Sequence, residues 1–344
     1  MRGSAAKRPT LSGVSAAPLL AHPTIGADLE RVELVLRDSV RTADAFLTDV
    51  ASHLIVAGGK RVRPLFSIAT SAVATPALAP ADLDVIRGGV SVELVHLGSL
   101  YHDDVMDEAT TRRGAESVNH RWGNLTAILA GDFLLAKASE IAASLGTEVA
   151  GLLAATIGRL CEGQVLELQT MFDPARTEDR YLASIGGKTA SLFATACRIG
   201  GIVGGLERDG IDAVTSFGDH YGMAFQIVDD VLDIVATDEQ LGKPAGNDLV
   251  EGVYTLPVLR TLGGPAGGEL ADLLGHPLEP AARDRARELV RANGAVAEAL
   301  AMARAYVDRA AAALEPFGPT EAAVALVESA TGLLADVELI ATAR

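Results

Sequence analysis

The sequence contains few cysteines, few aromatic side chains and no long hydrophobic run. Its two cysteines, Cys161 and Cys197, are too few for a disulfide framework or a cysteine-based metal site, so we interpret both as small core residues. Aromatic residues make up 4% of the chain and hydrophobic residues 49%, so the predicted core is aliphatic. A core rich in Ala and Leu favours α-helices over β-sheets.

Positive charge is also scarce, because 29 Lys and Arg residues stand against 45 Asp and Glu, giving a formal net charge of −16. An acidic surface repels phosphate backbones and anionic lipids, which argues against a nucleic-acid partner. Apolar stretches are short; residues 127–138, for example, are interrupted by Asp132 and Lys137. We therefore predict no integral membrane segment. The N-terminal apolar stretch is too short and broken for a signal peptide, so the expected location is cytoplasmic.

Helical patterning begins at Asp28, a plausible N-cap, and continues almost to the end of the chain. Residues 1–25 are rich in Ser, Ala, Pro and Gly and are expected to form a flexible tail. Residues 26–344 are predicted to form a single all-α domain, a large helical bundle around a central apolar cavity. Expected helices cover residues 28–57, 63–74, 81–108, 117–144, 147–170, 177–205, 210–236, 280–292, 295–314 and 319–341.

Two segments have the same pattern of acidic residues, DDVMD at 103–107 and DDVLD at 229–233. In a helix, the three aspartates of each segment are expected to share one face. Clustered carboxylates repel one another unless a cation lies among them, and oxygen ligands select a hard cation such as Mg²⁺. One such segment is weak evidence, since a helix end can be a solvated cap, but two on apolar helices favour a metal site. The predicted metal ligands are Asp103, Asp104, Asp107, Asp229, Asp230 and Asp233.

The few cations gather around the first of these segments. Gly58–Pro64 reads GGKRVRP, Arg112 and Arg113 follow the aspartates, and His96 lies two turns before Asp103. Basic residues beside metal-binding carboxylates indicate an anionic ligand such as a diphosphate. Two alternatives remain open: Lys60 as a helix C-cap and His96 as a satisfied core residue.

Gly186–Thr189 (GGKT) suggests a nucleotide-binding P-loop, but the position that requires the first glycine of that motif is Leu182. No strand pattern precedes the segment either. Lys188 and Gln226, one turn before Asp230, remain candidates for binding a diphosphate.

Five segments together resemble the trans-isoprenyl diphosphate synthases, in the order found in that family. They are GGKRVRP, ELVHLGSLYHDDVMDEATTRRG, GGKTASLF, FQIVDDVLDI and GKPAGNDL followed by TLP. The resemblance covers about residues 50–260. It implies an all-α homodimer that uses Mg²⁺ to condense isopentenyl diphosphate with an allylic diphosphate.

The resemblance also implies roles for individual residues. Catalysis would depend on Asp103, Asp104, Asp107, Arg112, Lys188, Asp229 and Asp230. The allylic diphosphate would contact Arg112, Lys188, Thr189, Gln226 and Lys243, and isopentenyl diphosphate would contact Lys60, Arg63, His96 and Arg113. One departure is Val253, where the family commonly has a lysine that faces the diphosphate.

Product length is expected to depend on Gly98 and Ser99, one turn before Asp103 along the predicted helix. Short-chain members of the family often have a bulky aromatic residue there, and this sequence has none. We therefore expect a product longer than geranylgeranyl, of about seven to nine isoprene units, since one helical turn of about 5.4 Å matches roughly one unit.

Four alternatives are weighed against this interpretation. They are a C15–C20 short-chain synthase, a class I terpene cyclase, a non-catalytic subunit of a heteromeric synthase and a helical scaffold without a ligand. The second aspartate segment and GGKRVRP disfavour the cyclase, and the intact set of six aspartates disfavours the silent subunit.

Overall fold

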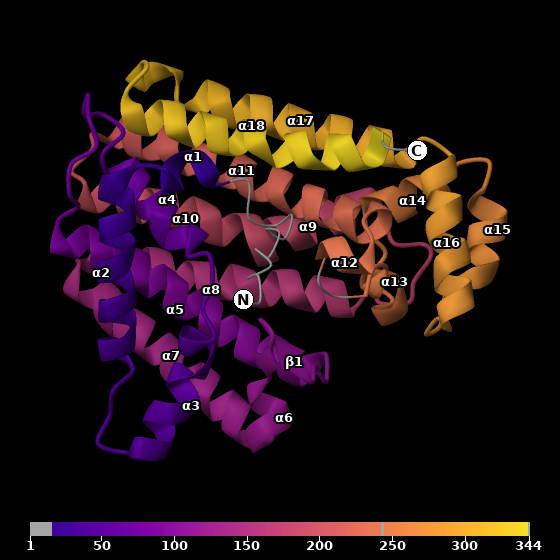
Figure 1. Ribbon diagram of the computed structural model, residues 1–344, viewed down its shortest axis with the longest axis horizontal. Helices are drawn as coiled ribbons and strands as arrows, with labels where there is room; N and C mark the ends of the chain where they lie inside the picture. Colours follow the sequence, from indigo (N-terminus) through magenta and orange to yellow (C-terminus); the bar gives the residue numbers. More distant parts are fainter. Residues whose placement is uncertain (1–15, 242–243, 343–344) are drawn as a thin grey trace, which may run out of the picture.

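The computed structural model describes residues 16–241 and 244–342, and its regular structure is almost entirely helical (Figure 1). The first half contains α1 (Ala17–Leu20), α2 (Pro23–Ser39), α3 (Ala45–Val56), α4 (Val62–Ser71), α5 (Leu83–Met106), the antiparallel strands β1 (Thr111–Arg112) and β2 (Ala115–Glu116), α6 (Val118–Trp122), α7 (Asn124–Ser144) and α8 (Thr147–Leu168). The second half contains α9 (Glu178–Ile185), the π-helix η2 (Gly186–Ala190), α10 (Ser191–Val203), α11 (Arg208–Val235), α12 (Asp238–Leu241), α13 (Asn247–Glu251), α14 (Leu256–Leu262), α15 (Gly267–Leu273), α16 (Pro280–Ala292), α17 (Ala295–Ala313), the 3-10 helix η3 (Glu315–Phe317) and α18 (Glu321–Thr342). The predicted all-α fold is confirmed.

The two long helices α5 and α11 form the centre of the molecule. Helix α5 is buried on most sides, because α4, α7 and α10 all pack against it. Helix α11 packs against α10 and is covered by the pair α17 and α18, which lie side by side along one face (Figure 1). Since α10 contacts both central helices, their C-terminal ends, each carrying an aspartate cluster, are held in one region of the fold.

The expectation of a flexible tail through residue 25 is wrong for residues 16–25. Here α1 and the start of α2 pack against the bundle, and Leu19 and Ile25 are fully buried. Pro18 and Pro23 resemble helix breakers in the sequence, but each lies in the first turn of a helix, where proline needs no N–H partner. Residues 1–15 lie outside the described residues.

Some predicted helices are divided in the structure. The helix expected at 28–57 becomes α2 and α3, because Asp44 caps the new helix by accepting a hydrogen bond from the Leu47 N–H at 3.0 Å. The helix expected at 117–144 is divided at Gly123, whose φ of 87° favours glycine. The short helices α12 to α15 fill a stretch with no predicted element, since their few turns give too short a pattern to detect.

The glycine pair at 186–187 does not break the helix, as the sequence suggested. Helices α9, η2 and α10 follow one another without an intervening loop, and the hydrogen bonding changes to a π-turn between them. A Cβ at Gly187 would lie 3.0 Å from the Gly163 Cα and 2.8 Å from the Arg159 carbonyl oxygen of α8. These glycines therefore allow η2 to pack closely against α8, which places Lys188 beside the site described below.

Within the described residues, α8 is the one helix long and apolar enough to cross a membrane by length and composition. A single helix of this kind is weak evidence for a membrane span, because core helices meet the same criterion.

Candidate active site

Two pockets of opposite charge lie near the ends of the central helices. The acidic pocket has a volume of about 580 Å³ and is lined by residues of α5, α8, α9, η2, α11 and the 248–255 segment. The basic pocket, of about 280 Å³, is lined by residues 57–63, by α5 and α10, and by Arg113 and Phe225. Lys60 of the basic pocket interacts electrostatically with Asp229, which adjoins Asp230 of the acidic pocket, so the two pockets are neighbours.

The first aspartate cluster occupies the last turn of α5, next to the acidic pocket. Burial, together with repulsion from Asp107, raises the pKa of Asp103 to about 6, although Lys188 acts in the opposite direction. The pKa of Asp107, which lines the pocket, is also raised, mainly by burial. Two carboxylates that resist ionisation together are suited to bind a cation.

Asp104 has a different role from its two neighbours. Its side chain is fully buried, and its Oδ1 accepts hydrogen bonds from both the Nε and the Nη2 of Arg112, each at 2.6 Å. The Asn119 amide also binds the Asp104 carbonyl, at 2.8 Å. Asp104 thus fastens the β1–β2 hairpin to the end of α5.

In the second aspartate cluster, too, the middle aspartate binds other side chains of the protein. The Asp230 carboxylate accepts hydrogen bonds from the Tyr181 hydroxyl at 2.6 Å and from the Gln226 amide at 2.8 Å. Burial raises the pKa of Asp230 to about 7. Thr189 continues this chain by donating to the Gln226 amide oxygen at 2.8 Å.

Asp229 and Asp233 lie on either side of Asp230 but differ in exposure. Asp229 is exposed to solvent, whereas only 3% of Asp233 is. The two carboxylate oxygens of Asp233 accept the backbone N–H groups of Asn247, at 3.3 Å, and Asp248, at 3.2 Å, which caps α13.

The three aspartates of each cluster therefore differ in exposure and in hydrogen-bond partners, and their joint role as metal ligands stays a prediction. A rotation of about 100° per residue separates the second aspartate of each cluster from the first. Asp104 binds Arg112, whereas Asp230 lines the acidic pocket while it is bonded to Tyr181 and Gln226. Asp103, Asp107 and Asp229 remain available for a ligand. Within the described residues, no group of three or more His, Cys, Asp or Glu side chains is arranged to hold a metal ion by itself.

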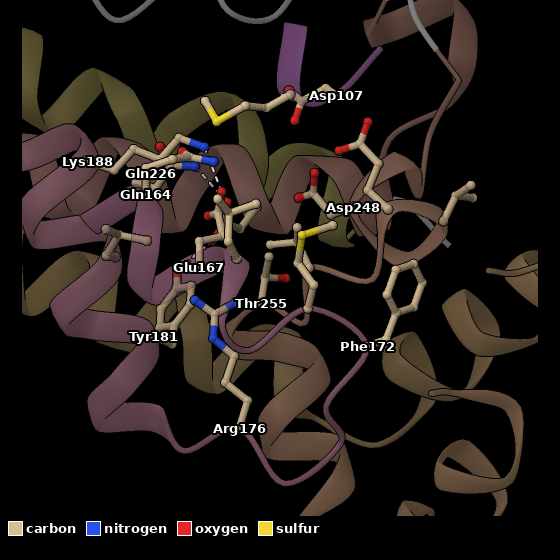
Figure 2. A pocket seen from close by; sticks show the side chains of 18 of the residues that line it. Asp107, Gln164, Glu167, Phe172, Arg176, Tyr181, Lys188, Gln226, Asp248 and Thr255 are labelled. Atoms are coloured by element: carbon tan, nitrogen blue, oxygen red, sulfur yellow. Dashed lines mark hydrogen bonds and ion pairs between the residues drawn. The ribbon is translucent and has the colours of Figure 1, made fainter. Parts of the chain in front are cut away.

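Lys188 projects from η2 into the acidic pocket, where its Nζ forms an ion pair with Glu167 of α8 at 2.6 Å (Figure 2). Burial alone would lower the pKa of Lys188, but Glu167, Asp103 and Asp107 together raise it above the ordinary value. Glu167 and Tyr181 belong to this site and were missed in the sequence, because neither is part of a recognised motif.

Four cationic side chains converge on the basic pocket. Arg61 is neutralised by Glu33, at 2.5 Å, and by Glu93, at 2.9 Å, and so has a structural role. Burial lowers the pKa of Lys60 to about 8 and that of Arg63 to about 10. The Nε of Arg63 is buried and has no hydrogen-bond partner among the described residues. Cations held under such desolvation indicate a site for an anion.

The remaining residues predicted for this pocket are His96 and Arg113. Burial and the nearby arginines Arg63 and Arg113 lower the pKa of His96 well below its usual value, so the imidazole is neutral. The Arg113 Nη1 donates to the Gly58 carbonyl, which ties the hairpin to the Gly58–Pro64 segment. The structure thus brings together all four residues predicted to bind isopentenyl diphosphate.

Gly98 and Ser99 differ in their surroundings. A Cβ at Gly98 would lie 3.1 Å from the Gly131 carbonyl oxygen and 3.2 Å from the Leu135 side chain, so this glycine allows α5 to pack on α7. The role of Gly98 in setting product length stays a prediction. Ser99 is half-buried, and its hydroxyl donates to the His96 carbonyl at 2.9 Å. Val253 lines the acidic pocket, as its place in the sequence predicted, and Lys243 lies outside the described residues.

Comparisons with known proteins agree with this geometry. Residues 44–292 match the family described as polyprenyl synthetase. The chain belongs to this family. It is 38% identical to a nonaprenyl diphosphate synthase of Mycobacterium tuberculosis over 303 residues, which cover 87% of this chain and 90% of that protein.

Solved structures of polyprenyl synthetases include both long-chain and shorter-chain enzymes. A polyprenyl synthase from Caulobacter crescentus, crystallised with calcium and isoprenyl diphosphate, is 34% identical, with a TM-score of 0.86 and coverage of 94% of this chain and 98% of that one. A geranylgeranyl pyrophosphate synthase from Corynebacterium glutamicum, with the same ligands, is 39% identical, with a TM-score of 0.79 and coverage of 91% and 96%. Overall similarity therefore identifies a prenyltransferase but does not by itself set the product length.

Proposed function

We propose that the protein condenses isopentenyl diphosphate with an allylic diphosphate, repeatedly, to give a trans polyprenyl diphosphate of more than twenty carbon atoms. The observation that carries this proposal is the pairing of an acidic and a basic pocket, close enough for Lys60 and Asp229 to interact. Two pockets of this kind suit two diphosphate substrates, whereas a terpene cyclase binds only one. The name of the mycobacterial relative supports a long-chain product.

The acidic pocket is the proposed site of the allylic diphosphate. Its oxygen ligands and its excess of carboxylates fit Mg²⁺, which binds few protein carboxylates together with substrate phosphates. Asp103, Asp107 and Asp229 would hold the ions, which would stabilise the negative charge of the departing diphosphate. Asp104 and Asp233 would mainly hold the hairpin and α13 in place, and Asp230, which lines the pocket, stays a predicted ligand. Lys188, Thr189, Gln226, Arg112 and Lys243 stay assigned to the diphosphate as predictions.

The basic pocket is the proposed site of isopentenyl diphosphate, held by Lys60, Arg63, His96 and Arg113. These groups fix the diphosphate end, so that the double bond points toward the acidic pocket. The bond between C1 and oxygen of the allylic substrate breaks, and the diphosphate leaves with the electron pair. The isopentenyl double bond then attacks C1, and the departed diphosphate accepts the proton that is lost. Exclusion of water protects the allylic cation from hydrolysis.

A second copy of the chain is the proposed partner, through α7 and α8. Leu125 and Leu129 of α7 and Val165 and Leu168 of α8 are exposed, although the two helices pack side by side. Large apolar side chains grouped on neighbouring helices are typical of an interface. Homodimer formation through this face would cover α8, a long apolar helix of which 22% of the most apolar stretch is buried.

The proposed function is tested by product chromatography after incubation with isopentenyl diphosphate, farnesyl diphosphate and Mg²⁺. We expect products of about seven to nine isoprene units, since the small Ser99 leaves the turn below Asp103 open. Ser99→Phe should shorten the product to about three or four units and preserve turnover, because the ring would block that turn. A wild-type product that ends at fifteen or twenty carbons would contradict the long-chain assignment.

The matched control is Thr331→Phe, on the exposed face of α18 and away from α7 and α8, which should leave the product unchanged. If the purified chain makes no product with either farnesyl or geranyl diphosphate, the catalytic proposal itself fails.

A further inference from the structure

Arg176 is a buried cation of the acidic pocket that the sequence motifs do not include. It lies between α8 and α9, is 5% exposed and lines the pocket. Figure 2 shows its guanidinium directed inward, between Tyr181 and Thr255. Its Nη1 donates to the Tyr254 carbonyl at 3.2 Å, whereas its Nε and Nη2 are buried and have no hydrogen-bond partner among the described residues.

This arrangement is costly in the absence of a ligand. Within the part of the chain that the structure describes, no carboxylate lies within ion-pair distance of Arg176, and Glu167 and Asp230 act on it only at longer range. Burial lowers the pKa of Arg176, but a guanidinium remains protonated in proteins. A buried charge with unpaired donors is strongly destabilising unless an anion completes it. The geometry therefore points to a bound anion.

The position of Arg176 relative to Val253 indicates which anion. The loop that carries Arg176 is fastened to the segment that carries Val253 by two hydrogen bonds, Phe172 N–H to Gly252 at 2.8 Å and Arg176 to Tyr254. These contacts lie on either side of Val253, which lines the same pocket and contributes no charge. A cation is thus present on the loop that packs against Val253.

We propose that Arg176 binds an oxygen of the allylic diphosphate and supplies the positive charge that Val253 does not. This inference rests on the proposed function of the acidic pocket. The Nε and Nη2 of Arg176 are both buried. Binding of the diphosphate therefore requires the guanidinium to turn so that these nitrogens face the pocket.

Calorimetric binding of inorganic diphosphate with Mg²⁺ tests the inference without requiring turnover. Arg176→Met should raise the Kd for diphosphate, and the KM for farnesyl diphosphate, by about tenfold to hundredfold, because a charge-assisted hydrogen bond is lost. The KM for isopentenyl diphosphate should change less than about twofold, since that substrate lies in the other pocket. Arg180→Met, which removes the same charge from an exposed side chain nearby, is the matched control and should change none of these constants.

Two further variants separate binding from a structural role. Val253→Lys in the Arg176→Met background should recover most of the lost affinity, because it restores a cation to the same part of the pocket. Val253→Lys alone should change the Kd by less than about threefold, since Arg176 already occupies that role, and this arm remains informative if Arg176→Met does not fold. An unchanged Kd in Arg176→Met, equal losses for both substrates, or no recovery in the double variant would overturn the inference. A wild-type enzyme that binds Mg²⁺-diphosphate but forms no product would contradict the proposed function alone.

Discussion

The two pockets are opposite in charge, although each is assigned a diphosphate. The acidic pocket has six carboxylates and two cations among its lining residues: Asp107, Glu108, Glu167, Asp230, Asp248 and Glu251 against Lys188 and Arg176. The basic pocket has four cations, Lys60, Arg61, Arg63 and Arg113, and one carboxylate, Glu93. A diphosphate in the acidic pocket would therefore need added metal cations, whereas a diphosphate in the basic pocket would bind to the protein's own cations directly.

On the proposed assignment, this contrast separates the site that breaks a bond from the site that only holds a substrate. A departing diphosphate gains charge during the reaction, and metal ions can stabilise that charge as it develops. The isopentenyl diphosphate keeps its own diphosphate throughout, so fixed cations suffice. On the proposed assignment, the charge of each pocket follows from the chemistry of its substrate.

The largest effect is expected from loss of the open aspartates. Asp103→Ala or Asp229→Ala should reduce kcat by about two orders of magnitude or more, because Mg²⁺ would no longer be held at the departing diphosphate. Steady-state turnover at saturating Mg²⁺ measures this effect, and circular dichroism checks the fold.

Asp84→Ala is the control on the same helix, because Asp84 is exposed in the first turn of α5. Turnover near the wild-type rate in either of the two aspartate variants would refute the metal assignment.

An intermediate effect is expected in the basic pocket. Arg63→Met should raise the KM for isopentenyl diphosphate by about tenfold to hundredfold, because a buried and incompletely paired guanidinium is lost. The Kd for Mg²⁺-diphosphate in the acidic pocket should stay the same. Arg87→Met, on an exposed side chain of α5, serves as the control. Equal changes in both constants would mean that the pockets do not act separately.

The smallest effect concerns pH. Burial lowers the pKa of Lys60 to about 8, so the free enzyme loses this charge as the pH rises through that value. Affinity for isopentenyl diphosphate should be constant below pH 8 and fall above it, by at most about tenfold per pH unit. KM measured from pH 6.5 to about 9.5 gives the profile. Lys60→Arg should remove the decline, because its guanidinium stays charged; an identical profile would assign the decline to another group.

The sequence predicted the helices that have a long pattern and the residues that occur in motifs. Helices α5, α8 and α11 appear close to their expected bounds, and α16 matches 280–292, because each has several turns of regular apolar spacing. The start of α2 was missed because of Pro23. Proline disrupts a helix when it lies in the interior but is favoured in the first turn, where Pro23 lies.

The site could be located from the sequence, but the roles within it could not be separated. Helical spacing placed Asp103, Asp104 and Asp107 together, yet only the packing of the hairpin shows that Asp104 binds Arg112. Glu167 and Arg176 carry no motif, and their place in the pocket depends on contacts between segments far apart in the chain. Such contacts are set by tertiary packing and leave no local pattern.

The π-turn of η2 also has a consequence for the register of the chain. A π-turn accommodates one residue more than an α-helical turn, so α9 and α10 are offset by one residue from a continuous α-helix. Removing a single residue from Gly186–Ala190 would restore regular α-helical bonding but rotate one flanking helix by about 100° relative to the other. Tyr181, which holds Asp230, and Phe193, which lies beneath Arg63, would then no longer face the two pockets together. The length of this short segment is therefore under as strong a constraint as the identity of its lysine.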